Sequence, residues 1–381
     1  MSDVTTHVIA EPPLRRLQEQ AGALFTEVAG RSVVRHYGDS LAEYRAVREG
    51  VGVAERSDRA RIRMWGKDPA KMLHGMVTND VANAAAGQGV YAAMLTPKGR
   101  MLAELRAFLR ALTEVLVELP REALAGTSEH LRKFVPPMFA RWADVSDEVD
   151  QIGVYGPHAA ALLERVLGAS FGEMEEDAFR EATFGDAAVM VAATRYVGGE
   201  PGFDLFTAPT VLAGVWTALL EHGADLGARP VGLAAIETLR IEAGRPRYGA
   251  ELSEEVIPTE AFEETGMMER AISFTKGCYT GQEVIVRIAH RGHVNRHLRG
   301  FRLGDGTAPA AGAPLFNAET GKEVGRLTSV AFSPMLGEAV ALGYARREVE
   351  PGAELRVGAP EGPPARVVRL PFQRGVEDGI E

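Results

Sequence analysis

The chain has 381 residues, 46% of them hydrophobic, and a formal net charge of -10 at pH 7. This length predicts two or three domains with ordinary cores, and the acidic balance disfavours a broad nucleic-acid surface, which needs clustered cations. No apolar run approaches the roughly 18 residues of a membrane span, and the first residues lack the layout of a signal peptide. With a single cysteine, we expect a cytoplasmic protein that neither binds nucleic acid directly nor enters a membrane.

The first part of the chain mixes helical and strand patterns, which predicts an α+β domain. Asp68 is a natural N-cap and Pro69 suits the first helical position, so one helix is expected to begin there. Helical patterns cover residues 14–28, 44–51 and 69–77, and strand patterns cover residues 60–64, 87–95 and 101–107.

The pattern changes after the acidic stretch 144–150. A β-α-β-β-α-β alternation follows, which suggests a ferredoxin-like unit over residues 146–229. Its predicted strands are 152–155, 187–196, 203–207 and 229–231, and its predicted helices are 158–167 and 211–222.

The remaining chain begins with a predicted helix over 233–243 that ends at Gly244, a suitable C-cap. From about residue 298, short apolar runs separated by Gly, Pro, Asn and Asp predict a small β-barrel or sandwich. We therefore expect a discontinuous α+β domain of residues 1–145 and 230–295, then the ferredoxin-like unit, and a C-terminal barrel of residues 296–381.

The single cysteine, Cys278, lies in the stretch KGCYTGQE. A lone thiol cannot form an internal disulfide, so a functional one acts as a nucleophile, a single ligand or a redox group. Gly277 and Gly281 permit unusual backbone angles, and Lys276 together with nearby arginines could stabilise a thiolate. The alternative is a small core residue, because free cysteine is among the most buried residue types.

A basic run follows this motif. Residues 287–299 contain four arginines and three histidines without an acidic residue. Such a run suits an anionic ligand or partner, or it forms a solvated face. A metal site built from Cys278, His290, His293 and His297 is a further alternative, but the spacing matches no closed zinc motif, and we predict no metal.

Several segments are similar to the folate-binding aminomethyltransferases of glycine cleavage. They are EYRAVR at 43–48, GVAERS at 52–57, TNDV at 78–81, GQGVY at 87–91 and LRIEAG at 239–244. Within that superfamily, KGCYTGQE resembles the signature of the YgfZ branch, whose members are tetrahydrofolate-dependent factors that support iron-sulfur enzymes. The resemblance implies an aminomethyltransferase-like folate-binding fold, tetrahydrofolate as cofactor, and iron-sulfur client enzymes, including tRNA-modifying enzymes, as partners.

The same resemblance suggests roles for individual residues. Glu200 resembles the glutamate that binds the pterin ring, Arg240 an arginine near the glutamyl tail, and Tyr91 a ring beside the pterin. Without the resemblance, Glu200 is expected to be an acidic residue in a turn, Arg240 to form a surface ion pair, and Tyr91 to be an ordinary core residue. In the motif, the resemblance implies Cys278 and Lys276 as the reactive centre and Gly277, Gly281 and Gln282 as ligand contacts.

One position departs from the transferase pattern. Transferases carry two aspartates on the strand after the PKG turn, and the first is thought to act on the folate nitrogen or the aminomethyl iminium. Here the pair reads Ala103-Glu104, and neighbouring strand residues point to opposite faces. We therefore expect an accessory factor for assembly or repair of iron-sulfur clusters, with a tetrahydrofolate-dependent aminomethyltransferase acting on a lipoyl carrier as the alternative.

Overall fold

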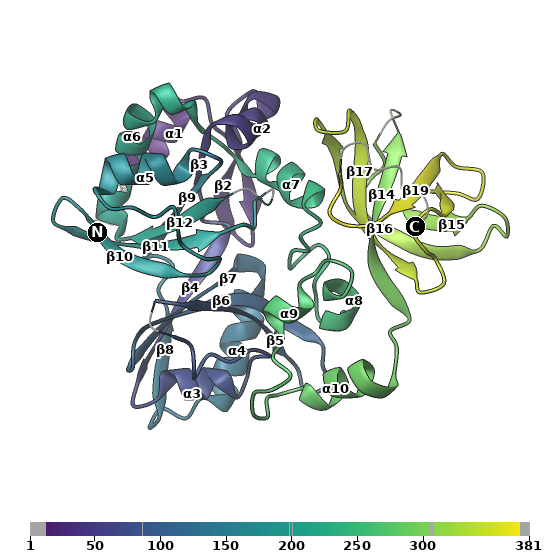
Figure 1. Cartoon of the computed structure of the whole chain (residues 1–381), viewed down its shortest axis with the longest axis horizontal. Coiled ribbons are helices and arrows are strands. Elements are labelled where there is room, and N and C mark those ends of the chain that lie inside the picture. The colour runs from purple at the N-terminus through teal and green to yellow at the C-terminus, as the bar shows by residue number, and fades with distance from the viewer. Residues whose placement is uncertain are drawn as a thin grey trace, which may run out of the picture.

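The computed structural model describes residues 13–373, apart from residues 86, 198, 200, 305 and 307. Two sheets face one another, the first antiparallel and the second antiparallel except for the parallel pair of its last two strands; helices cover their outer sides, and a separate barrel lies beside them (Figure 1). No helix in this described part of the chain is long and apolar enough to cross a membrane.

The first sheet has the strand order β5-β6-β7-β4-β8 and carries α3 and α4 on its outer side. Its β6 strand shows the two-residue period clearly: Ala103 and Leu105 pack toward the helices, while Phe108 packs toward the second sheet. The elements are β4 (Arg59–Gly66), α3 (Pro69–His74), β5 (Gly89–Leu95), β6 (Met101–Ala111), β7 (Glu114–Pro120), α4 (Leu124–Phe134) and β8 (Ala140–Asp144).

The start of α3 confirms the predicted cap. The Asp68 side chain accepts a hydrogen bond from the backbone N–H of Lys71 at 3.3 Å, and Pro69 occupies the first turn. The helix ends at His74, three residues before the predicted end at 77.

The second sheet has the order β10-β11-β12-β9-β3-β13, with α5 and α6 on its outer side. The structure contains the predicted strands and helices of this unit and one further strand, β10. In addition, β3 from the N-terminal part of the chain joins the sheet between β9 and β13. The elements are β3 (Val51–Glu55), β9 (Asp150–Tyr155), α5 (Ala159–Leu167), β10 (Phe179–Phe184), β11 (Ala187–Thr194), β12 (Gly202–Thr207), α6 (Pro209–His222) and β13 (Ala228–Pro230).

The N-terminal segment differs from the predicted helix over 14–28. Gly22, with a φ of +84°, follows the end of the helix, and the apolar residues after it form a hairpin instead. The elements are α1 (Pro13–Gln20), β1 (Leu24–Val28), β2 (Arg31–His36) and α2 (Ser40–Glu49).

Helix α7 lies between the second sheet and the barrel (Figure 1). It ends close to the predicted position, and Gly244 has a φ of +65° beyond its last turn. The KGCYTGQE motif forms the loop before α10 and its first turn. The elements are α7 (Leu233–Glu242), α8 (Pro258–Phe262), α9 (Met268–Ala271) and α10 (Gln282–Arg291).

The C-terminal strands form a closed barrel in the order β14-β17-β16-β15-β18-β19, which confirms the barrel rather than the sandwich. Pairing of β14 with β19 closes it, and buried side chains such as Phe301 and Leu327 fill its interior. The strands are β14 (Arg296–Gly304), β15 (Pro314–Asn317), β16 (Glu323–Ser333), β17 (Glu338–Arg346), β18 (Glu354–Val357) and β19 (Pro364–Val368).

Candidate functional site

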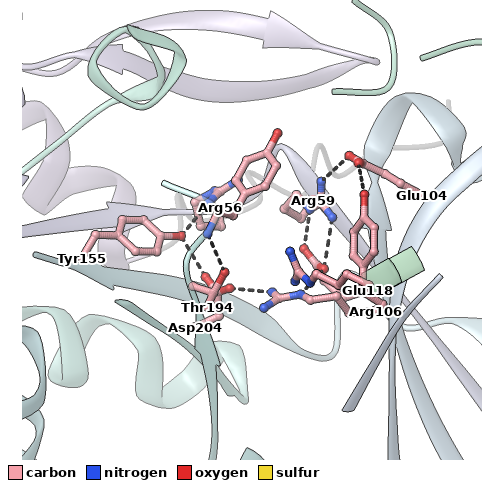
Figure 2. A pocket seen from close by; sticks show the side chains of 11 residues that line it. Arg56, Arg59, Glu104, Arg106, Glu118, Tyr155, Thr194 and Asp204 are labelled. Atoms are coloured by element: carbon pink, nitrogen blue, oxygen red, sulfur yellow. Dashed lines mark hydrogen bonds and ion pairs between the residues drawn. The ribbon is translucent and has the colours of Figure 1, made fainter. Parts of the chain in front are cut away.

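A narrow, highly charged cavity lies between the facing sides of the two sheets (Figure 2). The cavity volume is about 20 Å³, enough for roughly one or two water molecules. The lining consists of Arg56, Arg59, Tyr91, Glu104, Arg106, Glu118, Tyr155, Thr194, Tyr196, Asp204 and Arg270.

Glu118 on β7 is held between two guanidinium groups. Arg106 Nε donates to its Oε2 at 3.0 Å, and Arg59 donates to both carboxylate oxygens. Burial alone would raise the pKa of Glu118, but Arg106 and Arg59 hold that pKa well below its usual range. Glu118 is therefore a fixed anion across the whole physiological pH range.

The network continues from the first sheet into the second. Arg106 also donates to Asp204, whose other oxygen accepts a 2.8 Å hydrogen bond from the Tyr155 hydroxyl. Arg56 donates to that hydroxyl at 2.5 Å and forms a bidentate pair with Asp58 at 2.8 and 2.9 Å. Because these charges are buried or half-buried and each is paired, the network fixes the two sheets relative to one another.

Glu104 on β6 has a different environment from Glu118. Its Oε2 accepts a 2.8 Å hydrogen bond from the Tyr91 hydroxyl, and Arg59 Nη1 lies 3.5 Å from its Oε1. Burial raises the pKa of Glu104, although Arg59 and Tyr91 act against that increase. Two neighbouring carboxyl groups whose pKa values are moved in opposite directions are typical of a proton-transferring acid beside a fixed anion.

The structure shows which of the residues 103 and 104, where the chain departs from the transferase pattern, faces the cavity. Ala103 is fully buried in the core under α3 and α4, whereas Glu104 lines the cavity. The predicted alternation is confirmed, but the cavity side of β6 belongs to position 104. An alanine at 103 therefore removes no carboxylate from the cavity.

Two buried donors that line the cavity lack a partner among the described residues. They are Arg106 Nη1 and the hydroxyl of Tyr196. Buried polar atoms are nearly always satisfied by protein, water or ligand. The cavity is therefore suited to a ligand that presents oxygen or nitrogen acceptors.

Comparison with protein-family models matches both parts of the chain. The GCVT N-terminal domain matches residues 14–276, and the glycine cleavage T-protein C-terminal barrel domain matches residues 296–373. The chain belongs to the glycine cleavage T-protein family. The match confirms the predicted aminomethyltransferase-like α+β fold with a C-terminal barrel.

Relatives of this T-protein family member span nearly its whole length. An aminomethyltransferase from Saccharopolyspora erythraea is 34% identical over 96% of this chain and 98% of its own. One from Halothermothrix orenii is 29% identical over 94% of this chain and 99% of its own. The crystal structure of glycine cleavage system aminomethyltransferase T from Bartonella henselae shares the fold, with a TM-score of 0.82, 24% identity, and coverage of 95% and 97%.

The thiol of Cys278 is exposed, so the structure does not place it in a core. Lys276, two residues earlier, is buried, and its Nζ donates to the backbone oxygens of His74, Val77 and Asn79 at 2.5, 2.6 and 3.1 Å. Burial lowers the pKa of Lys276 to about 8. An ammonium group has three N–H donors, so Lys276 ties its loop to the α3–β5 connection and has no donor left for the thiol.

The other motif residues have structural surroundings of their own. Gly277 is exposed, with room for a Cβ, and Gln282 begins α10. Gly281 has a φ of +82°, and a Cβ there would lie 2.6 Å from the backbone oxygen of Thr96. Glycine is therefore required at 281 by the close packing of the loop. None of these residues lines the cavity.

The folate-contact predictions have three different outcomes. Tyr91 lines the cavity, and Arg270 stacks 4.4 Å from its ring centre. Glu200 lies outside the described residues. Arg240 is fully buried, and all five of its N–H groups have protein partners: Glu237, Glu251, Ser329 and the backbone oxygen of Arg245.

Most of the cavity residues were missed by the sequence analysis. The side chains of Arg59, Arg106, Glu118 and Asp204 each lie within a strand whose residues are mostly buried. A charge inside such a strand is costly unless it is paired. Charged residues at these strand positions therefore indicate a buried polar site in the sequence. Their partners on other strands could not be read from one sequence.

The basic run divides between two elements. Arg287 and His290 are exposed on α10, while Arg299 on β14 is buried and paired with Glu264. The described residues contain no group of three histidine, cysteine, aspartate or glutamate side chains arranged to hold a metal ion. The metal alternative built on Cys278 and these histidines gains no support.

Proposed function

We propose that this protein transfers a one-carbon unit of the aminomethyl type with tetrahydrofolate as its cofactor. The observation that supports this most strongly is Glu104, hydrogen-bonded to Tyr91 in a narrow cavity beside the fixed anion Glu118. Such a pair suits a reaction in which one carboxyl group transfers a proton and the other keeps its charge. The relatives that match almost the whole chain carry the name aminomethyltransferase.

The donors of the cavity suit the polar edge of a reduced pterin. Arg106 Nη1 and the Tyr196 hydroxyl have no described partner and could donate to ring nitrogen or oxygen atoms. Bound tetrahydrofolate would supply the nitrogen atoms that accept or release the one-carbon unit. The present space of about 20 Å³ holds water rather than a ring, so binding requires lining side chains to move apart.

The residues of this chain divide the work as follows. Glu104 holds and releases a proton at its carboxyl group, and the Tyr91 hydroxyl fixes the orientation of that group. Arg270 restrains the Tyr91 ring from the other side. The two packed sheets exclude bulk water, which strengthens each of these polar interactions.

The test compares Glu104→Gln with the unaltered protein in an assay for methylenetetrahydrofolate formed from an aminomethyl-loaded carrier. Loss of the proton-transferring group should lower kcat by about 10²-fold or more, with little change in tetrahydrofolate affinity by calorimetry. Glu129→Gln, on the exposed side of α4, is the matched control. Absence of transfer by the unaltered protein, or full activity of Glu104→Gln, would refute the proposal.

A second candidate is an accessory role for iron-sulfur client enzymes in the cytoplasm, as the YgfZ-like motif suggests. The exposed thiol of Cys278 favours it, because a client or cluster could reach that sulfur. The test replaces Cys278 by Ala in cells that lack the native gene and measures iron-sulfur enzyme activities, including tRNA methylthiolation. Full rescue by the variant would remove the thiol from this role, whereas loss of rescue with normal protein levels would support it.

A further inference from the structure

Arg59 is the one side chain of the described cavity that contacts both carboxyl groups of the proposed acid and anion pair. Its Nε and Nη2 donate hydrogen bonds to the two carboxylate oxygens of Glu118. Its remaining nitrogen, Nη1, donates to Glu104 Oε1 over 3.5 Å. The double contact with Glu118 fixes the plane of the guanidinium, because a bidentate pair defines both distance and direction. By fixing this plane, Glu118 also fixes the direction in which Arg59 Nη1 points, which is toward Glu104.

We propose that Arg59 is a positioning residue that sets the orientation and the proton affinity of Glu104. This inference rests on the proposed proton-transferring role of Glu104. The contact to Glu104 is longer than those to Glu118, so Arg59 holds the Glu104 carboxylate in a single, weaker ion pair than the bidentate one with Glu118. Glu104 is thereby able to change protonation state, while Glu118 is not.

Every element packed around Glu104 contributes a charged or titratable group. Removing a cation from this set should raise the pKa of Glu104, and removing an anion should lower it. The groups are Arg59 from β4, Tyr91 from β5, Arg106 from β6 itself, Glu118 from β7, Tyr196 after β11 and Arg247 after α7.

The experiment therefore uses two substitutions with opposite expected effects. Arg59→Met keeps most of the stem and removes the charge, so the pKa of Glu104 should rise by about 1 unit or more. Glu118→Gln removes the anion and frees Arg59 for Glu104, so the pKa of Glu104 should fall. A merely structural role of Arg59 would leave the titration of Glu104 unchanged in Arg59→Met, and the fall in Glu118→Gln shows that the titration responds to charge in either direction.

The readout is the infrared carboxyl band of Glu104 in ligand-free protein, assigned by its loss in Glu104→Gln and followed against pH. Arg63→Met, at an exposed position of the same strand, is the control and should leave the titration unchanged. Arg59→Lys keeps the positive charge, so the pKa of Glu104 in this variant should stay close to its value in the unaltered protein. If Arg59→Met does not fold, Arg59→Gln, which removes the charge but keeps a polar side chain, gives the same answer through the sign of its own shift.

The pH profile of kcat in the transfer assay should move in the same two directions. Unchanged titration in both variants, or shifts of the same sign, would overturn the role of Arg59 while leaving transfer activity intact. Opposite infrared shifts in a protein without transfer activity would instead uphold the control of Glu104 by Arg59 and refute the proposed function.

Discussion

Lys276 and Glu104 show how the surroundings of a single side chain decide its use. The sequence places Lys276 beside the only cysteine, yet its ammonium group donates to three backbone oxygens of residues 74–79. Glu104, by contrast, retains a hydroxyl partner and a loosely held cation in a cavity. The first is bound into the framework, and the second is able to exchange a proton.

Replacing Lys276 by Met should destabilise the protein without altering the thiol itself. The change leaves backbone oxygens without their buried donor, which costs about 1–3 kcal/mol of unfolding free energy. Urea denaturation measures this difference, and Lys322→Met at an exposed position should stay within about 0.5 kcal/mol. An unchanged midpoint for Lys276→Met would contradict the anchoring role.

How far the sequence predicts the site is clear from residues 103 and 104. The period of two in a strand correctly separates their side chains onto opposite faces. The resemblance to the transferases points to position 103 for the reacting carboxylate, whereas the face that meets the cavity is set by the second sheet, most of whose strands come from residues 150–230. Tyr91 was assigned to the site through resemblance, and its bond to Glu104 emerged only from the fold.

At the scale of elements, local signals were sufficient where a cap or a turn defines the boundary. Asp68 with Pro69 begins α3, and Gly244 follows α7, as predicted. The hairpin of β1 and β2 was missed because its residues also fit a helical period, and only the Gly22 break distinguishes the two. The parallel pairing of β3 with β13 joins distant segments and has no local signature.

The cap of α3 is open to a direct test. Asp68→Ala removes the acceptor for the Lys71 N–H and should lower the unfolding free energy by about 1 kcal/mol. Asp68→Asn keeps an acceptor oxygen and should recover most of the loss. Thermal and urea unfolding followed by circular dichroism gives both values, and equal stability of the Ala and Asn variants would show that the cap contributes nothing.

At the scale of the whole molecule, α7 connects the sheets to the barrel through buried charges. Arg240 pairs with Glu251 at 2.9 Å and donates to Ser329 of β16 at 2.7 Å. Glu242, on the same helix, accepts from Tyr44 of α2 and from Ser333 of β16. The barrel was predictable from its turns, but this charged connection was not, because the partners on α7 and β16 lie about 90 residues apart in the chain.

Replacing Arg240 by Met should weaken the connection between barrel and sheets more than it weakens either part. The change leaves Glu251 as an unpaired buried charge, which costs about 3–5 kcal/mol. Differential scanning calorimetry should show a lower and broader transition, or two separate transitions. Arg326→Met, at an exposed position of β16, is the control, and a single unchanged transition for Arg240→Met would contradict the prediction.

The hydroxyl groups of β16 also govern which barrels this protein could accept from its relatives. Thr328 and Ser329 donate to Glu251 at 2.7 and 2.6 Å, and Ser333 donates to Glu242. A chimera whose foreign barrel carries apolar residues at these positions would bury two carboxylates without the donors that β16 supplies. A stable chimera must therefore take β16 and the α7 segment from the same parent protein. The two elements have to be exchanged together, although about 80 residues separate them in the chain.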